Sequence, residues 1–193
     1  VNDKDEDKMI ESIIYTLTSI DGIDKVIIKV EGEVLNKLPN SKTNIPTVLD
    51  KSYGINKSYD LSNLNDILSY TTYYTSTYND TKYYVPVTKY INSKDSDVVK
   101  IIIKELGSSP IYQTNLMSYL NANTVLNDYE LDNNKLKLNF NELLLNDLDK
   151  KNILEEVIYT ISLSMNNVYD NLESVSFLVN NEEIYTININ DIK

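Results

Sequence analysis

The sequence has 193 residues, with 18 lysines, no arginine and 29 acidic residues, so its net charge at pH 7 is −11. Phosphate backbones repel so acidic a chain, which argues against nucleic-acid binding. Histidine and cysteine are absent, which excludes Ser-His-Asp and Cys-His catalysis and zinc sites built from nitrogen and sulfur ligands. No apolar run approaches the roughly 20 residues needed to cross a bilayer.

The chain opens with a charged run, residues 1–7, which is predicted to be a solvated tail or the acidic first turn of a helix. Because the sequence begins at Val1 without a signal peptide, we expect a piece of a longer product whose export or anchoring signal lies in the missing part. Residues 8–19 are predicted to form an amphipathic helix, followed by a strand at 25–30 and a short return strand at 34–35. The helix should turn five apolar residues inward: Met9, Ile10, Ile13, Ile14 and Leu17.

Residues 38–65 lack regular periodicity and are rich in Pro, Asn, Ser and Asp. They also contain Ile45, Val48 and Leu49, and a floating linker would carry fewer apolar side chains. We therefore interpret this stretch as an interdomain connection that packs against its neighbours.

Two tyrosine-rich segments, residues 67–77 and 82–91, are predicted to form a β-hairpin around a turn at 78–81. Pro86 lacks an amide hydrogen, so it should lie at an edge or on the non-bonded side of its strand. Side chains alternate between the faces of a strand, so some tyrosines must face outward, where they can contact a protein or stack on sugar rings. Alternatively, tyrosine merely replaces phenylalanine, since there are 16 tyrosines and two phenylalanines. The candidate interaction residues are Tyr70, Tyr73, Tyr74, Tyr83 and Tyr84.

A helix is predicted at residues 96–106, capped by Ser93 and Asp95 and ended by Gly107. A second hairpin is predicted at residues 124–131 and 135–140. Its last strand alternates apolar and polar residues, so one face should be buried and the other exposed to solvent. The exposed face would carry Lys135, Lys137 and Asn139.

Carboxylates are the remaining candidates for catalytic chemistry. Two pairs stand where helix caps stand, and capping explains both; two further pairs fall on predicted polar faces. Nothing in their spacing places two carboxylates across a cleft, as a glycosidase requires, and four scattered glycines cannot make a phosphate-binding loop. The sequence therefore predicts no catalytic residue, no metal ligand and no cofactor. The pairs are Asp95 and Asp97, Asp147 and Asp149, Glu155 and Glu156, and Glu182 and Glu183.

Residues 153–178 are predicted to form a helix that leads into an apolar strand, and a short edge strand is expected at 183–189. Much of the 153–178 segment recurs at residues 9–30: IYTL at 14–17 aligns with IYTI at 158–161, and Val26 aligns with Val175. Such a repeat indicates two copies of one supersecondary unit. The second copy is predicted to be an α+β two-layer sandwich, with strands in one layer and two helices in the other. One face of its last helix should carry Leu154, Val157, Ile158, Ile161 and Met165.

In this order the motifs resemble the GerMN domain of sporulation and spore-germination proteins. The resemblance is carried by KYYVPVTKYI (82–91), VVKIIIKELGSSP (98–110), LNDYELDNNKLKLNFNELL (126–144), ILEEVIYTIS (153–162) and ESVSFLVNNEEI (173–184). It implies the closing half of a truncated first GerMN domain at residues 1–38, a connector at 39–66 and a complete second domain at 67–193.

The family has no catalytic residues, and its domain is similar to ring-building modules of secretion-system-like assemblies. The resemblance therefore implies a non-enzymatic scaffold in the envelope complex that joins mother cell and forespore in spore-forming Firmicutes. Other proteins of that complex are the implied partners, and homo-oligomerisation is a further option. The implied place is the intermembrane space around the forespore, with a lipid anchor in the missing amino-terminal part. The alternatives are a peptidoglycan-binding module that uses the tyrosine hairpin and, third, a wall hydrolase.

Overall fold

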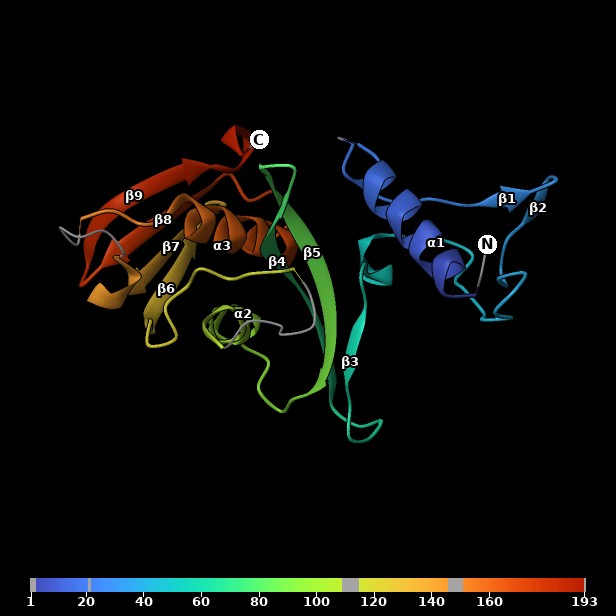
Figure 1. The fold of residues 1–193 in the computed structure, drawn as a ribbon, viewed down its shortest axis with the longest axis horizontal. Coiled ribbons are helices and arrows are strands. Elements are labelled where there is room, and N and C mark those ends of the chain that lie inside the picture. Colours follow the sequence, from blue (N-terminus) through green and yellow to red (C-terminus); the bar gives the residue numbers. More distant parts are fainter. Residues whose placement is uncertain (1–2, 21, 109–114, 146–150, 193) are drawn as a thin grey trace. The chain divides into compact units, whose positions relative to one another are not determined.

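The structure is a computed structural model that describes residues 3–20, 22–108, 115–145 and 151–192. The chain divides into two units, residues 1–58 and residues 59–193. The division falls inside residues 39–66, the range predicted as a connector. Both units contain a helix and paired strands, so the predicted α+β class is confirmed (Figure 1).

The first unit is built on helix α1 (Asp3–Thr18), followed by the hairpin of β1 (Lys29–Val30) and β2 (Glu33–Val34) and the 3-10 helix η1 (Lys51–Tyr53). The strand predicted at 25–30 is shorter, since Val26 forms only an isolated bridge with Leu49. The return strand begins one residue earlier than predicted. Three of the five core residues come from the stretch after the hairpin, which packs as predicted: Ile10, Ile14, Leu38, Ile45 and Leu49.

Helix α1 buries a narrower apolar stripe than predicted. Ile10 and Ile14 are buried, but Met9 is 47% exposed and Ile13 is 38% exposed. The described part of the first unit contains no second α-helix to cover that side of α1. The sequence repeat aligns Ile13 with Val157, which is only 1% exposed in the second unit. The inward prediction is therefore wrong for Met9 and Ile13, because the first unit lacks the packing partners that cover the second.

The charged run at the start of the chain belongs to α1, so the helix is the correct one of its two predicted alternatives. Glu6 is nevertheless buried. Its two carboxylate oxygens accept hydrogen bonds from the backbone N–H groups of Asn40 at 3.1 Å and Ser41 at 3.0 Å. Burial opposes the charged form, but the hydrogen bonds from Ser41 and Asn40 together outweigh it and lower the pKa of Glu6.

The second unit begins with a long hairpin, β4 (Ile67–Tyr78) and β5 (Thr81–Asn92), and β3 (Ser58–Asp60) completes a sheet in the order β3-β5-β4. Tyr78 pairs with Thr81, so the turn has two residues and not the four predicted. These residues, Asn79 and Asp80, have φ angles of 48° and 61°. Positive φ at both positions is typical of a type I′ turn, whose twist matches that of the strands.

A second sheet contains β6 (Leu126–Asp132), β7 (Lys135–Phe140), β8 (Ser174–Val179) and β9 (Glu182–Asn188), in chain order. Strands β7 and β8 are parallel, and helix α3 (Glu155–Val168) lies in the crossover that parallel neighbours need. Helix α2 (Val98–Gly107) lies between β5 and β6 in the chain, and the 3-10 helices η2 (Glu142–Leu144) and η3 (Ile189–Asp191) follow β7 and β9. The strands thus form two sheets where one layer was predicted, and Figure 1 shows α2 between the hairpin and the four-stranded sheet.

One hydrophobic core joins both helices to the four-stranded sheet and the hairpin. At its centre the fully buried rings of Phe140 and Phe177 stack with their centroids 6.4 Å apart. Helix α2 adds a stripe of Val99, Ile102, Ile103 and Leu106. Leu154, predicted to be buried with the rest of its helix face, is 37% exposed because it is the N-cap residue and precedes the first turn of α3.

Asn139, which was predicted to be exposed to solvent, is only 5% exposed. Its amide nitrogen donates to Asp128 Oδ2 at 2.9 Å and to Asn181 Oδ1 at 2.8 Å. Its amide oxygen accepts the backbone N–H of Asn181 at 3.0 Å. The side chain therefore joins β6, β7 and the turn between β8 and β9, a role that strand alternation cannot reveal.

The internal repeat is present in the structure. Helix α1 followed by β1 and β2 has the same order of elements as α3 followed by β8 and β9. Each hairpin turns through two residues with positive φ, Glu31 and Gly32 in the first and Asn180 and Asn181 in the second. When Val26 is aligned with Val175, Glu31 corresponds to Asn180 and Gly32 to Asn181. Both copies therefore turn at the same position of the repeat.

Candidate interaction surface on the tyrosine hairpin

Two of the five candidate tyrosines belong to the core. Tyr70 is 6% exposed and Tyr74 is 3% exposed. The hydroxyl of Tyr74 donates to Glu105 Oε1 on α2 at 2.9 Å, and Lys89 forms an ion pair with the same oxygen. Burial, and after it the carboxylate of Glu105, raises the pKa of both tyrosines far above the ordinary value. The prediction of an interaction surface is therefore wrong for Tyr70 and Tyr74, because β4 turns these rings towards α2.

Tyr73 and Tyr84, on the other face of the hairpin, are half-buried. The ring of Tyr84 lies against Tyr159 of α3, with 5.3 Å between centroids. Burial, together with the charges of Glu155 and Glu156, raises the pKa of Tyr84 to about 12. Both rings keep some accessible surface, but contact with α3 limits what Tyr84 can offer a partner.

An ion pair between Lys82 of β5 and Glu156 of α3 fixes the outer part of the hairpin. Glu156 is 9% exposed, so its predicted place on a polar face is wrong. The hydrogen bond from Lys82 holds the pKa of Glu156 below its ordinary value. The pairing partner lies far away in the sequence, and helix periodicity alone could not identify it.

The backbone of β4 is also held on its outer edge. The N–H of Tyr73 donates to Ser164 Oγ at 2.9 Å, and Thr75 exchanges two backbone hydrogen bonds, of 2.9 and 2.8 Å, with Met117. Since the N–H of Tyr73 points away from β5, its pair with Pro86 is a non-hydrogen-bonded one. Pro86 therefore lies on the non-bonded side of its strand, as predicted, and removes one donor from the side of β5 that faces away from β4.

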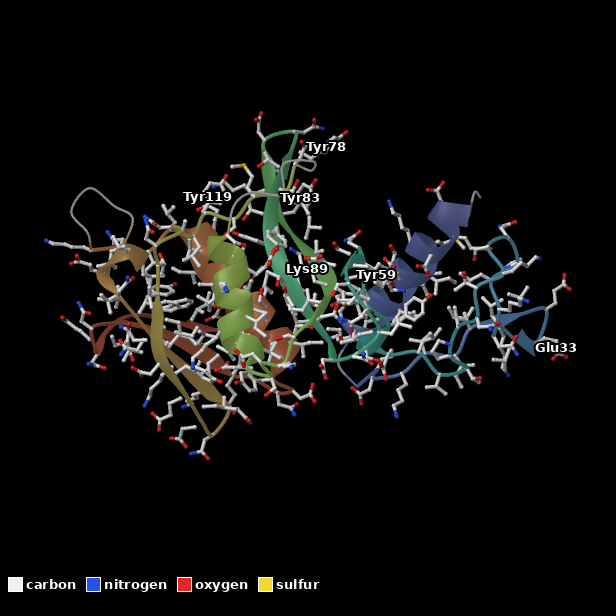
Figure 2. The ribbon with its side chains drawn as sticks, turned by 90° about the horizontal axis from the view of Figure 1, so that it is seen from below. Glu33, Tyr59, Tyr78, Tyr83, Lys89 and Tyr119 are labelled. Carbon is white, nitrogen blue, oxygen red and sulfur yellow. The ribbon has the colours of Figure 1, made fainter. Side chains whose placement is uncertain are left out.

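Two large side chains at the tip of the hairpin, Tyr78 and Tyr83, are exposed, and so is Met117 on the segment that bridges to Thr75 of β4. We call these three residues the tip patch. They are 69%, 44% and 48% exposed, respectively. Figure 2 shows Tyr78 and Tyr83 near the end of the hairpin. Tyr83 was among the candidate residues from the sequence, whereas Tyr78 fell within the predicted turn at 78–81. Reading Asn79-Asp80 as a two-residue turn would have placed Tyr78 at the end of β4.

The carboxylates suspected as helix caps are only partly described. Asp97, and not Ser93 or Asp95, caps α2 by accepting the N–H of Lys100 at 3.1 Å. Burial opposes ionisation of Asp97, but hydrogen bonds from Lys100 and Tyr129 prevail and lower its pKa. Glu182 and Glu183 are exposed, as predicted. The last pair, Asp147 and Asp149, lies outside the described residues.

Within the described ranges, no group of three or more acidic side chains is placed to hold a metal ion. No helix in the described part of the chain has the length and hydropathy needed to cross a membrane.

A family model described as "Germane: Sporulation and spore germination" matches residues 1–36 and 71–185. The chain belongs to this family. Its two matched segments contain α1 with the first hairpin and most of the second unit. Residues 37–70 lie outside the match, and they include the stretch that packs against α1.

Among known Germane proteins, the chain is 31% identical over 183 residues to the spore germination protein GerM of Bacillus subtilis strain 168. The aligned region covers 92% of this chain and 49% of that protein. The solved structure of the tandem GerMN domains of the sporulation protein GerM from Bacillus subtilis superimposes with a TM-score of 0.86 at 29% identity. That match covers 94% of this chain and 64% of the solved chain. The sequence thus spans about half the length of the curated relative, and the tip patch lies inside the Germane match.

Proposed function

We propose that this Germane chain is a non-catalytic scaffold module in the envelope complex between mother cell and forespore, and that it binds other proteins of that complex through the tip patch. The observation that carries the proposal is an exposed aromatic patch on a hairpin that is braced at several points. The match to sporulation and germination proteins supports a role in sporulation. The proposed binding surface is inferred from the exposed side chains of this chain.

The tip patch has the composition of a protein-binding site. Tyrosine and methionine are enriched at protein interfaces, where a ring with a polar hydroxyl gives large contact area with a hydrogen-bonding end. Lys82–Glu156 and the ring contact of Tyr84 with Tyr159 hold the hairpin beneath the patch. A braced hairpin loses less conformational entropy on binding, so more of the contact energy remains as affinity.

A non-catalytic role is supported by the state of three buried or half-buried carboxylates in the second unit. Glu156 is paired with Lys82, Glu105 with Lys89, and Asp97 caps α2. Each carboxylate already makes a structural contact. A carboxylate held in this way is poorly suited to act as a general acid or base, which must exchange protons with a substrate. The wall hydrolase considered from the sequence gains no support from them.

We further propose, from the family resemblance, that the full protein acts outside the cytoplasm in the intermembrane space around the forespore and is held there by a lipid anchor. Homo-oligomerisation is part of the same proposal. The peptidoglycan alternative relied on outward-facing tyrosines of the hairpin, and the burial of Tyr70 and Tyr74 removes two of the five candidates. The hairpin itself therefore favours a protein partner over a glycan.

The test is a pull-down of the tagged, full-length protein from detergent-solubilised sporulating cells, with quantitative mass spectrometry. The double variant Tyr78→Ala, Tyr83→Ala is compared with Tyr185→Ala, which removes an exposed tyrosine from β9. We expect the wild type and Tyr185→Ala to recover the same envelope proteins and the double variant to lose them. Equal recovery by all three, or recovery of wall fragments alone, would contradict the proposal.

A further inference from the structure

The second unit contains a solvent-open cavity of about 590 Å³ beside helix α2. Small-molecule sites have volumes of about 300–1,000 Å³, so the cavity can hold such a ligand. No member of the tip patch lines it. It is therefore separate from the surface proposed to bind proteins.

One wall of the cavity is a face of α2. Lys100, Lys104 and Ser108 follow one another at four-residue steps, and Ile101 and Glu105 stand beside them. Residues at this spacing share one side of a helix, opposite the stripe that α2 buries in the core. Lys100 pairs with Asp97 at 3.2 Å, whereas the ion pairs seen among the described residues do not include Lys104. This wall presents an ammonium group to the cavity without an acidic partner of its own.

The facing wall is formed by the end of β5 and the loops beside it. Asn92 fixes this wall, because its Oδ1 accepts the N–H of Ser62 at 2.7 Å and its Nδ2 donates to the carbonyl of Asn65 at 2.6 Å. The N–H of Ser93 donates to the carbonyl of Asp66 at 2.9 Å. Hydrogen bonds hold these groups before any ligand arrives, which lowers the entropy lost on binding.

Tyr70 and Glu105 also line the cavity. Glu105 already accepts the hydroxyl of Tyr74 and pairs with Lys89, so its charge is balanced within the protein. A carboxylate held in this way suits binding and positioning better than proton transfer. The cavity is therefore arranged as a binding site.

The lining favours a ligand without net charge. Asp60 and Asp95 oppose Lys100 and Lys104, so an anion or a cation would meet like charges as well as opposite ones. Hydroxyl groups can donate to the carboxylates and accept from the ammonium groups, and so they use both kinds of side chain. Ile91 and Ile101, both half-buried, give the apolar surface against which the C–H face of a sugar ring can lie.

We propose that this cavity binds an uncharged, polyhydroxylated ligand, a short segment of glycan. The scaffold role does not require this site, so the inference goes beyond it, and a failed binding test would leave that role untouched. The site also differs from the hairpin surface considered in the peptidoglycan alternative, because it is built from α2 and the base of the hairpin.

The test is a titration of the whole ¹⁵N-labelled chain with chitotetraose, and separately with cellotetraose, followed by amide NMR shifts. We expect saturable shifts at Ser93, Lys104 and Ser108, and a Kd about tenfold higher or more in Lys104→Ala, the loss of one charged hydrogen bond. Ser108→Trp, which fills the cavity mouth, should abolish the shifts. Lys137→Ala, on the four-stranded sheet, should bind as the wild type does.

Three outcomes would overturn the inference. The first is the absence of saturable shifts with both oligosaccharides. The second is equal affinity in the wild type and in Lys104→Ala. The third is stronger binding of citrate or of the dipeptide Gly-Gly in the same cavity, which would assign it to a charged ligand. Amide spectra of each variant report directly whether its fold is intact.

Discussion

The ammonium group of Lys57 lies 3.4 Å from Glu11 Oε1, and it joins the end of the first unit to helix α1. The other oxygen of Glu11 accepts the N–H of Asn56 at 2.7 Å, and Asp7 also contacts Lys57 at 3.4 Å. Both partners of the Lys57–Glu11 pair are largely buried, with side-chain exposures of 11% and 4%. These contacts and those of Glu6 attach the stretch after the first hairpin to α1.

Replacing Glu11 by Ala is predicted to destabilise the first unit by about 1–3 kcal/mol, because the N–H of Asn56 and the ammonium group of Lys57 both lose a buried acceptor. Hydrogen exchange measured by mass spectrometry should show faster exchange in residues 22–58 and unchanged exchange in the second unit. Glu33→Ala, at an exposed position in β2, is the control and should leave exchange unchanged. A Glu11→Ala protein with the exchange of the wild type would show that the pair contributes nothing.

The stability of the first unit should fall in acid because of Glu6. Its folded-state pKa lies below the ordinary value of 4.5, so its contribution is complete above pH 4.5 and is lost as the pH falls through the folded pKa. Burial raises the pKa of Glu11, so that residue acts in the opposite direction. Denaturation at pH 7 and at pH 3 should therefore show a smaller pH effect in Glu6→Gln than in the wild type. An unchanged pH effect would mean that another group is responsible.

Asn139→Ala should destabilise the second unit by about 1–3 kcal/mol, since it removes three hydrogen bonds made by a side chain that is only 5% exposed. Thermal or urea denaturation followed by circular dichroism measures the change. Lys137→Ala, two residues away on the same strand and exposed, should change stability by less than about 0.5 kcal/mol. Equal effects of the two substitutions would contradict the role assigned to Asn139.

The repeat permits a matched comparison of the two helices. Val157→Ala removes a buried side chain and should cost roughly 1.5–3 kcal/mol. Ile13→Ala, at the aligned position in α1, should cost less than about 1 kcal/mol, because its side chain is already 38% exposed. Unit-specific hydrogen exchange separates the two effects. A larger cost for Ile13→Ala would show that this face of α1 is covered in solution.

Much of the fold follows from local patterns in the sequence. The apolar stripe of α2, the helix–strand repeat and the turns at Asn79-Asp80 and Asn133-Asn134 carry periodicity or turn chemistry that indicates each element directly. The division of the strands into two sheets was missed, because strand partners are set by long-range packing and alternation does not identify them.

The candidate site was less accessible to sequence reasoning. Alternation shows that some hairpin tyrosines face outward but does not say which face meets α2, so Tyr70 and Tyr74 were assigned to the wrong side. Glu156 was misplaced for a similar reason, since its partner Lys82 is 74 residues away. Burial of single polar side chains depends on contacts that only the folded chain brings together.

We propose that the tip patch carries the function of this Germane protein. The most direct measurement is the count of heat-resistant spores formed by the host when its full-length protein carries Tyr78→Ala and Tyr83→Ala. We predict that the count falls strongly while the level of the protein, measured by immunoblot, stays normal, and that Tyr185→Ala sporulates like the wild type. A normal spore count in the double variant would contradict the account.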